Sequence, residues 1–367
     1  MISIIFPTFK RSSEVKYNLE FFRENISIPY EVFVLDNSPE SMKYDFEQNE
    51  KYIFLNKNIG TSSRNAGIKQ ANAPICLLLD DDSHPFPGTV EKIVEDFKSL
   101  PNDCAGLISE IHNPDGGREA TLLPTVFHGA GVAFKTEALI ENDIFYPENY
   151  CFYGEEYRMT LEIYRAGFHL KESTNFKVMH RRSNKGRDLN KIFYYLGRNN
   201  RAIWEDIVPE KYRKQVIYDS QRRYELTSAK EGVSEAFAKG LSEEIKSPGL
   251  SPMSEAQFEK YALIDKIKSL PGHENYTLCG AGKFPSLWAQ ILKDKKCHTN
   301  IGDFNPGLSG QHFDKSEINT SEDILFDNTS YILGHGSSTD SSKWSELLKQ
   351  NNREYIDIHL GNELHAC

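Results

Sequence analysis

The segment Ile75–Pro85, ICLLLDDDSHP, runs from five apolar residues directly into three consecutive aspartates. The apolar run predicts a buried strand, because strands covered on both faces are continuously hydrophobic. Like charges on neighbouring residues repel one another unless a cation or a helix terminus compensates them. Two interpretations follow, an acidic loop in solvent or a divalent-metal site, and this segment alone does not separate them.

Length and composition describe an ordinary folded protein. The chain has 367 residues, of which 39% are hydrophobic and 26% are charged, so it can bury a core and form more than one domain. The net charge of −10 argues against a broad nucleic-acid-binding face, and we expect no nucleic-acid partner. The six cysteines lack CxxC spacing, which favours reduced thiols in the cytoplasm over disulfides or a zinc site.

The N-terminal sequence MISIIFPTFKR lacks a basic region followed by a long apolar stretch, so we expect no signal peptide. No apolar run approaches the roughly 20 residues that a membrane helix needs. We therefore expect a cytoplasmic protein without a membrane span. Peripheral association with the inner face of a membrane is compatible with this expectation.

Short apolar runs alternate with amphipathic patterns up to about residue 200. They predict strands at Ser3–Phe9, Glu31–Ser38, Lys51–Asn56 and Pro74–Asp80, and helices at Ser13–Asn25, Gly60–Ala71 and Gly88–Leu100. This alternation predicts an α/β fold with a mainly parallel, Rossmann-like sheet and helices on both faces. Such sheets bind ligands beyond the carboxyl ends of their strands, where Pro7, Thr8, Asp36 and the aspartate triplet fall. We expect these groups to converge on one crevice.

The sequence changes character in its second half. Residues 206–270 read as a helical connector, in which Ser254 and Gln257 predict a capping box at the start of a helix. Residues 271–367 read as a small α/β, Rossmann-like accessory domain. We expect this domain to serve acceptor recognition or self-association into a homo-oligomer.

The small domain carries half of a dinucleotide-binding pattern. Gly280 and Gly282 follow a predicted strand, and Asp303 ends the next strand about 20 residues later. Pro285 stands where a third glycine is expected. Nucleotide binding here is therefore the lesser alternative.

Eight segments resemble, in order and spacing, glycosyltransferase family 2, whose catalytic domain has the GT-A nucleotide-diphosphosugar transferase fold. They are SIIFPTFKR, VLDNS, NKNIGTSSRNAGIKQA, LLLDDDSHPFPG, FHGAGVAFKTEAL, FYGEEYRMTLEIYRAGF, KVMHRRS and YYLGRNNRAIW. The resemblance implies a GT-A domain over residues 1–205. It also implies inverting, non-processive transfer of a sugar from a nucleoside-diphosphate sugar, a UDP-sugar foremost, to an acceptor hydroxyl in glycan or glycoconjugate biosynthesis. The acceptor stays open among a saccharide, a lipid-linked sugar, a small molecule and a peptide.

The resemblance implies a nucleotide-sugar site at the strand ends. The candidate residues are Pro7, Thr8, Asp36, Asn58, Gly60, Arg64, Asp80, Asp81, Gly129 and Gly131. Thr8 and Asp36 would contact the base and ribose, although Thr8 also fits a plain turn. Arg64, beside a helix start, would reach the diphosphate. The glycines of GAGVAF would admit the donor sugar close to the backbone, or simply form a tight turn.

In the same resemblance, the aspartate triplet corresponds to the metal-binding DXD motif of the family. One or two carboxylates can hold Mn²⁺ or Mg²⁺, which neutralises a departing nucleotide diphosphate. Asp80 and Asp82 share one side of a continued strand pleat, with Asp81 opposite. We expect Asp82 to be the most direct ligand and Asp80 to lie nearer the ribose or water. His180 would add an imidazole, with a purely structural histidine equally open.

The acidic pair Glu155 and Glu156 begins a predicted helix and corresponds to the catalytic base of the family. We expect Glu156 to deprotonate the acceptor hydroxyl, since a carboxylate near a helix N-terminus stays ionised. The family commonly has aspartate here, and Arg158 and Glu162 also depart from its usual residues. The choice between the two glutamates therefore stays open. The basic segment Arg181–Arg187 is either a loop over the diphosphate or a solvated run of charge.

Two other functions stay open. A sugar-phosphate nucleotidyltransferase would carry a glycine- and lysine-rich loop after the first strand, where this chain has PTFKRSSE. A nucleotide-binding protein with a vestigial transferase domain, using its C-terminal domain for a dinucleotide, fits poorly with the retained triplet and glutamate pair. A processive synthase is disfavoured, because the chain lacks a QxxRW motif and membrane helices.

Overall fold

The computed structural model describes residues 1–119, 125–181, 188–313, 316–325, 329–333, 338–358 and 364–365. These residues form two compact units, which we describe separately. Unit 1 takes in the described residues up to 181, and unit 2 takes in those from 188 onward. The three-part division at residues 205 and 270 stays a prediction.

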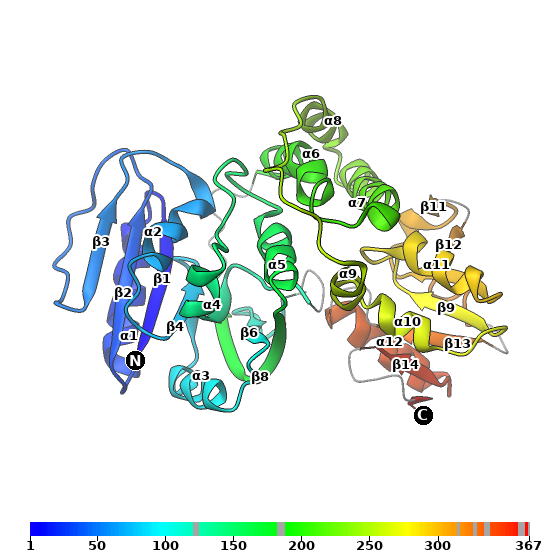
Figure 1. The fold of residues 1–367 in the computed structure, drawn as a ribbon, viewed down its shortest axis with the longest axis horizontal. Coiled ribbons are helices and arrows are strands. Elements are labelled where there is room, and N and C mark those ends of the chain that lie inside the picture. The colour runs from blue at the N-terminus through cyan, green and yellow to red at the C-terminus, as the bar shows by residue number, and fades with distance from the viewer. Residues whose placement is uncertain are drawn as a thin grey trace. The chain divides into compact units, whose positions relative to one another are not determined.

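Unit 1 is built on one sheet (Figure 1). Its described strands are β1 Ile2–Thr8, β2 Tyr30–Asp36, β3 Glu50–Phe54, β4 Ile75–Leu79, β5 Ser83–Pro85, β6 Cys104–His112, β7 Gly131–Lys135 and β8 His169–His180, in the order β3-β2-β1-β4-β7-β6-β8-β5. Strands β3, β2, β1 and β4 run parallel, whereas β7 is antiparallel to both β4 and β6. The first four predicted strands are confirmed, with ends displaced by one or two residues.

The helices of unit 1 cover this sheet. They are α1 Ser12–Asn25, α2 Arg64–Ile68, α3 Thr89–Lys98, α4 Thr136–Glu141 and α5 Glu155–Arg165, together with the 3₁₀ turn η1 Gly60–Ser63. Val15, Leu19 and Phe22 of α1, spaced three or four residues apart, are fully buried in the same core as β1, β2 and β4. All five residues of β4 are buried, as its sequence predicts.

The predicted helix at Gly60–Ala71 is shorter than expected. The chain forms η1 first, and α2 ends at Ile68. The hydroxyls of Ser62 and Ser63 donate to the carbonyls three residues before them, at 2.8 Å each. Such local bonds compete with the regular helical pattern and favour a tighter first turn.

Unit 2 combines helices with a second sheet (Figure 1). Its described helices are α6 Leu189–Trp204, α7 Glu210–Lys230, α8 Ser234–Ser242, α9 Glu255–Tyr261, α10 Ile264–Ser269, α11 Pro285–Asp294 and α12 Ser338–Gln350, with the 3₁₀ turn η2 Pro306–Leu308. Its strands are β9 Asn275–Cys279, β10 His298–Asp303, β11 His312–Phe313, β12 Ser316–Thr320, β13 Ser330–Leu333, β14 Tyr355–Asp357 and β15 Leu364–His365, in the order β11-β12-β10-β9-β13-β14-β15.

The central strands of this second sheet, β12, β10, β9, β13 and β14, run parallel. The predicted fold class is therefore confirmed: a first α/β unit, then helices, then a small Rossmann-like sheet. The predicted capping box is confirmed as well, since Ser254 accepts from the amide of Gln257 and the Gln257 side chain accepts from the amide of Ser254.

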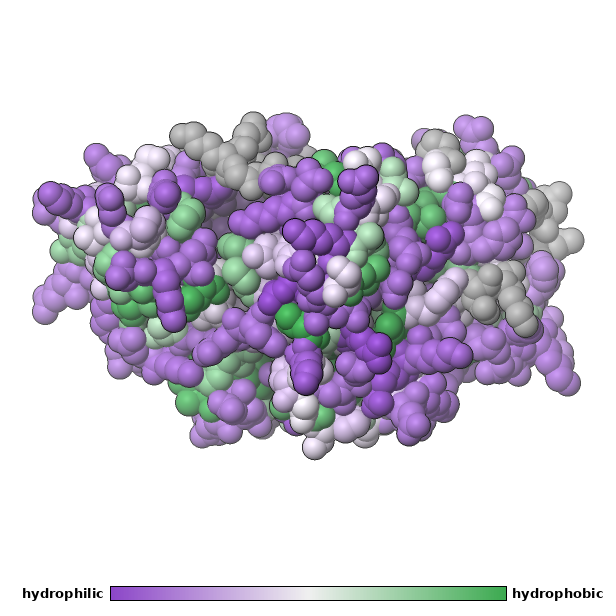
Figure 2. Space-filling model, turned by 90° about the horizontal axis from the view of Figure 1, so that it is seen from above, coloured by the Kyte–Doolittle hydropathy of each residue, from purple (hydrophilic) through white to green (hydrophobic). Residues whose placement is uncertain are grey.

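No helix in the described part of the chain is long and apolar enough to span a membrane. Figure 2 shows one face of the molecule, where hydrophilic residues cover most of the surface and hydrophobic ones form small clusters between them.

Asp219 of α7 holds the beginning of α11. Its carboxylate accepts hydrogen bonds from the hydroxyl of Ser286 and, at 3.1 Å, from the amide of Leu287. The residue is fully buried, and this burial raises the pKa of Asp219 to about 7, against the lowering effect of those bonds. The amino end of α11 is therefore capped from within unit 2.

We expect unit 2 to lose stability as the pH rises from about 4 to about 8, and Asp219→Asn to flatten that dependence. A carboxyl whose pKa is raised by folding contributes stability at low pH, and the contribution is lost as pH rises through the raised pKa. All three tryptophans, Trp204, Trp288 and Trp344, lie in unit 2, so tryptophan fluorescence during urea unfolding follows this unit. Asp265→Asn, at an exposed position of α10, is the control. An equal pH dependence in Asp219→Asn and wild type would contradict this account.

Candidate active site

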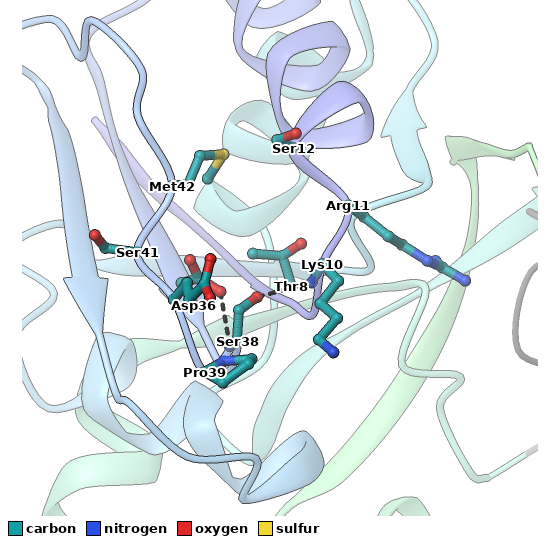
Figure 3. Close-up of a pocket in the computed structure, with 10 residues that line it drawn as sticks. Thr8, Lys10, Arg11, Ser12, Asp36, Ser38, Pro39, Ser41 and Met42 are labelled. Atoms are coloured by element: carbon teal, nitrogen blue, oxygen red, sulfur yellow. Dashed lines mark hydrogen bonds between the residues drawn. The ribbon is translucent and has the colours of Figure 1, made fainter.

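A cavity of about 340 Å³ lies at the carboxyl ends of β1 and β2 (Figure 3). It is lined by Thr8, Lys10, Arg11, Ser12, Asp36, Ser38, Pro39, Glu40, Ser41 and Met42. Thr8 and Asp36 are paired across the two parallel strands, so the sheet register itself brings them together. The amide of Lys10 donates to the hydroxyl of Ser38 at 2.8 Å, which ties the loops after both strands to each other.

Two of the predicted nucleotide-binding residues thus line one cavity. Asp36 is nearly fully buried, and its two oxygens accept from the amide of Ser38 at 2.9 Å and the hydroxyl of Tyr52 at 2.6 Å. The same hydroxyl accepts from the amide of Met42 at 2.8 Å, so Asp36 also fixes the loop that walls the cavity. Pro7 precedes Thr8 on β1, paired with Leu35, and is not among the lining residues.

The aspartate triplet lies next to this cavity. Asp81 accepts from the hydroxyl of Thr8 at 2.8 Å, which joins the end of β1 to the residues after β4. Arg11 donates from one nitrogen to Asp81 at 2.8 Å and to Asp82 at 3.1 Å. Burial raises the pKa of Asp81 to about 6, although Arg11 and Thr8 oppose that rise.

Asp80, Asp82 and His180 come together as predicted. One potential ligand atom from each lies within 4.8 Å of the other two. Two carboxylates and one imidazole suit Mn²⁺ better than Mg²⁺, which prefers oxygen ligands alone. The donor set therefore fits a divalent cation, for which Asp80, Asp82 and His180 would supply the ligand atoms.

These ligand atoms have internal partners. His180 Nε2 lies 3.2 Å from Asp82, and its Nδ1 lies 3.0 Å from Glu119. Burial lowers the pKa of His180, but the bonds to Asp82 and Glu119 outweigh burial and raise it to about 10. A cation bound at Nε2 would take the place of that proton, while Glu119 would continue to orient the ring through Nδ1.

Arg64 is buried between the aspartate triplet and Gly129, the first residue of the GAGVAF segment. Its Nη2 donates to the carboxylate of Asp80 at 2.5 Å and to the carbonyls of Leu79 at 3.0 Å and Gly129 at 3.3 Å. Its guanidinium also faces the ring of Tyr146, 5.4 Å from the ring centroid. The predicted diphosphate ligand thus pairs with Asp80 in this structure.

Glu155 and Glu156 begin α5 and face different neighbours. A Cβ added to Gly129 would lie 3.3 Å from Oε1 of Glu156 and 3.7 Å from Nη2 of Arg64, so Glu156 lies on the side of the triplet. Burial raises the pKa of both glutamates, and a hydrogen bond from Thr61 opposes the rise at Glu155. Glu155 is 3% exposed, and its Oε2 has no hydrogen-bond partner in the described part of the chain.

The loop before this pair is held by η1. Cys151, Tyr153 and Gly154 have positive φ angles of 65°, 63° and 94°, an uncommon backbone conformation for side-chain-bearing residues. The amide of Thr61 donates to the carbonyl of Cys151 at 3.1 Å. Gly60, with φ of 69°, lies so close that an added Cβ would fall 1.8 Å from that carbonyl oxygen. Gly60 therefore permits the close approach that positions the glutamates.

We expect Gly60→Ala to destabilise unit 1 by more than about 3 kcal/mol, because backbone strain and a clash add together. Gly88→Ala is the matched control, since Gly88 has a similar φ of 76° but nothing within 4 Å of an added Cβ. Strain alone should cost about 1 kcal/mol there. Differential scanning calorimetry measures both, and equal losses of stability would contradict the assigned contact.

The other predicted residues have local roles. Asn58 accepts from the amide of Gly60 at 2.9 Å and so shapes the entry to η1. Gly131 lies within β7, where an added Cβ would fall 2.4 Å from the hydroxyl of Ser109. Of the basic segment Arg181–Arg187, only Arg181 belongs to the described residues.

In unit 2, the half dinucleotide-binding pattern makes contacts within the unit. Asp303 accepts from the amides of Ala281 and Asn305, both at 2.8 Å. The carbonyl of Gly282 accepts from Arg223 of α7 at 2.6 Å. Asp303, the carbonyl of Gly282 and the amide of Leu287 in the first turn of α11 therefore each have a partner within unit 2.

Three residues of the site escaped the sequence prediction: Arg11, Glu119 and His128. Arg11 lies three residues after the end of β1, directly before α1, and a basic residue in this short connection was the available signal. Glu119 contacts His180 as described above and lies 3.5 Å from His128. Neither Glu119 nor His128 has a local pattern that marks it, because each meets its partners only in the folded chain.

Comparison with known proteins agrees with this geometry. Residues 3–153 match the model of glycosyl transferase family 2. This segment, which is less than half of the chain, is similar to that family. The unit that carries it has the α/β architecture with a mainly parallel first half of the sheet that was predicted.

The uncharacterized glycosyltransferase YwdF of Bacillus subtilis is 32% identical over 104 residues. The match covers 27% of this chain and 38% of that relative, so the chain spans under two-fifths of its length. TarS 1-349 of S. aureus, solved with UDP-GlcNAc, is 15% identical with a TM-score of 0.46, over 80% of this chain and 88% of that chain. Mannosyltransferase PcManGT from Pyrobaculum calidifontis, solved with GDP-Man and Mn²⁺, is 14% identical with a TM-score of 0.43, over 66% and 74%.

Proposed function

We propose that the chain is an inverting, metal-dependent glycosyltransferase that moves a sugar from a nucleoside-diphosphate sugar to an acceptor hydroxyl. The observation that carries the proposal is the hydrogen bond from Thr8 to Asp81, which joins the 340 Å³ cavity to the triplet. A base and ribose in the cavity would place their diphosphate beside Asp80 and Asp82. We favour a UDP-sugar as the donor and manganese as the cation.

The residues of the chain divide the work. A divalent cation at Asp80, Asp82 and His180 would neutralise the leaving diphosphate. Arg64 fixes Asp80 and the carbonyl of Gly129, near which the donor sugar would lie. Glu156 removes the proton from the acceptor hydroxyl as that oxygen attacks the anomeric carbon and the bond to the diphosphate breaks. One such displacement inverts the anomeric centre.

We expect the chain to bind one of UDP, GDP or dTDP tightly in the presence of Mn²⁺ and at least roughly tenfold more weakly after EDTA treatment. Asp82→Asn should abolish this metal dependence, because it removes a carboxylate ligand without changing side-chain volume. Asp45→Asn, at an exposed position outside the site, is the control. Calorimetric titration measures each affinity. Nucleotide binding that is indifferent to metal in wild type would refute the metal assignment, and binding of none of the three would refute the proposed donor class.

Glu156→Gln should keep donor binding but lower kcat by roughly 10²- to 10⁴-fold, the usual contribution of a general base. Glu155→Gln should affect kcat less, because Glu155 faces Thr61 rather than the triplet. Burial raises the pKa of Glu156, so activity should fall on acidification with an apparent pKa above the ordinary glutamate value. The rate of product formation from the bound donor and a panel of glycan acceptors measures kcat. A larger loss of kcat in Glu155→Gln than in Glu156→Gln would make Glu155 the base instead of Glu156.

For residues 271–367 we propose acceptor recognition or self-association. Asp303 and the carbonyl of Gly282 have partners within unit 2, which favours an accessory role over a second nucleotide site. The acceptor class stays open among a saccharide, a lipid-linked sugar, a small molecule and a peptide. Five cysteines, Cys76, Cys104, Cys151, Cys279 and Cys297, are free thiols, which favours the reducing cytoplasm as the place of work.

A further inference from the structure

Arg11 lies between the cavity and the candidate metal ligands. Its Nη1 donates to Oδ1 of Asp81 at 2.8 Å and to Oδ2 of Asp82 at 3.1 Å. The residue also lines the cavity, and Figure 3 shows its side chain extending away from the loop that carries Ser38 and Met42. The guanidinium therefore reaches from the nucleotide side of the site to the metal side.

The two carboxylates need a cation at this place. Asp81 and Asp82 are adjacent in sequence and each is only 5% exposed. Two neighbouring negative charges withdrawn from water are costly unless a positive charge compensates them. Arg11, whose side chain is 26% exposed, supplies that charge from the edge of the site.

Arg11 is not needed to shape the triplet, because other residues hold its backbone. Asn18 donates to the carbonyl of Asp81 at 2.9 Å, and the amide of Arg181 donates to the carbonyl of Asp82 at 2.8 Å. Ser83 completes the turn, with its amide bonded to the carbonyl of Asp80 at 3.1 Å. The guanidinium of Arg11 therefore contributes charge rather than scaffolding.

A divalent cation and Arg11 would compete for the same carboxylate. Oδ2 of Asp82 accepts from Arg11, and Oδ1 faces His180. Building on the proposed function, we propose that Arg11 is the counter-ion of the free triplet and a ligand of the donor diphosphate. Its guanidinium leaves Asp82 when a divalent cation binds there and pairs with the diphosphate that arrives beside it. Guanidinium groups bind phosphate oxygens in a two-pronged geometry, which suits this second partner.

Arg11→Gln tests the proposal through two affinities that should change in opposite directions. Mn²⁺ alone should bind roughly five- to tenfold more tightly, because two charge-assisted hydrogen bonds no longer compete for the carboxylates. The nucleoside diphosphate that wild type binds should bind at least roughly tenfold more weakly at saturating Mn²⁺, because a phosphate ligand is lost. Electron paramagnetic resonance of free Mn²⁺ gives the first affinity, and calorimetry with UDP, GDP and dTDP gives the second.

Arg23→Gln is the matched control. Arg23 lies on α1, which begins just after Arg11, is equally exposed at 25%, and makes a two-pronged pair with Glu50 at 2.6 and 2.8 Å. We expect it to change neither affinity. Arg11→Lys keeps the charge and should recover part of the nucleotide affinity.

Two results would overturn the proposal: weaker Mn²⁺ binding in Arg11→Gln, or a nucleotide affinity equal to wild type, whatever the affinity for Mn²⁺. The first would make Arg11 an organiser of the metal ligands instead of their competitor. The proposed function fails separately, if wild type binds none of the three nucleotides with Mn²⁺. Unchanged affinities in Arg11→Gln beside a wild type that does bind would overturn only the role of Arg11.

Discussion

Compensation of buried negative charge is the constraint on which the site in unit 1 depends. The triplet follows a strand whose five residues are all buried, and Asp81 and Asp82 are each only 5% exposed, whereas the side chain of Asp80 is 33% exposed. The pKa of Asp81 remains raised, to about 6, even with hydrogen bonds from Thr8 and Arg11. Each aspartate has at least one basic partner: Arg64 pairs with Asp80, Arg11 pairs with both Asp81 and Asp82, and His180 also pairs with Asp82.

These partners come from three distant parts of the chain, and this links the site to the fold. Arg11 precedes α1, Arg64 begins α2 and His180 ends β8. Arg11 follows β1, the parallel neighbour of β4, whereas His180 reaches the triplet through the antiparallel pairing of β8 with β5, where it lies opposite Ser83. The site can therefore form only when the sheet folds. In an unfolded chain the three aspartates would repel one another, because their basic partners lie far away in sequence.

Much of this was predictable from sequence, because it depends on local pattern. The strands of unit 1, the parallel sheet and the capping box at Ser254 follow from apolar runs and caps, whereas the grouping of Asp80, Asp82 and His180 was implied by the family resemblance. The pairing of Arg11 with residues 70 and 71 positions later does not, since many surface arginines look the same in sequence. The shortened helix at residues 60–68 was not predicted either. The hydroxyls of Ser62 and Ser63 donate to carbonyls three residues earlier, which favours a 3₁₀ turn over a regular first turn of α-helix.

The dinucleotide pattern of unit 2 also depends on contacts that the sequence does not display. Its glycines and Asp303 stand at the expected spacing, yet what a helix terminus binds depends on what already occupies it. Asp219, 66 residues before Pro285, caps α11, and Asp303 folds back on Ala281. The spacing correctly predicted a strand–turn–helix unit. Whether its polar groups can bind a ligand depends on tertiary contacts, which the spacing does not show.

An internally neutralised triplet changes how a metal motif should be understood. If Arg11 and His180 satisfy Asp82 in the free chain, a cation must displace partners before it binds, and its affinity alone is low. A nucleoside diphosphate that draws Arg11 away removes part of this competition, so each ligand strengthens the other by the same factor. The metal and the donor then enter as a coupled pair. The negative charge of the aspartates and of the diphosphate is then compensated before and after the ligands bind. A solvated acidic loop would not need such compensation, whereas a buried diphosphate site does.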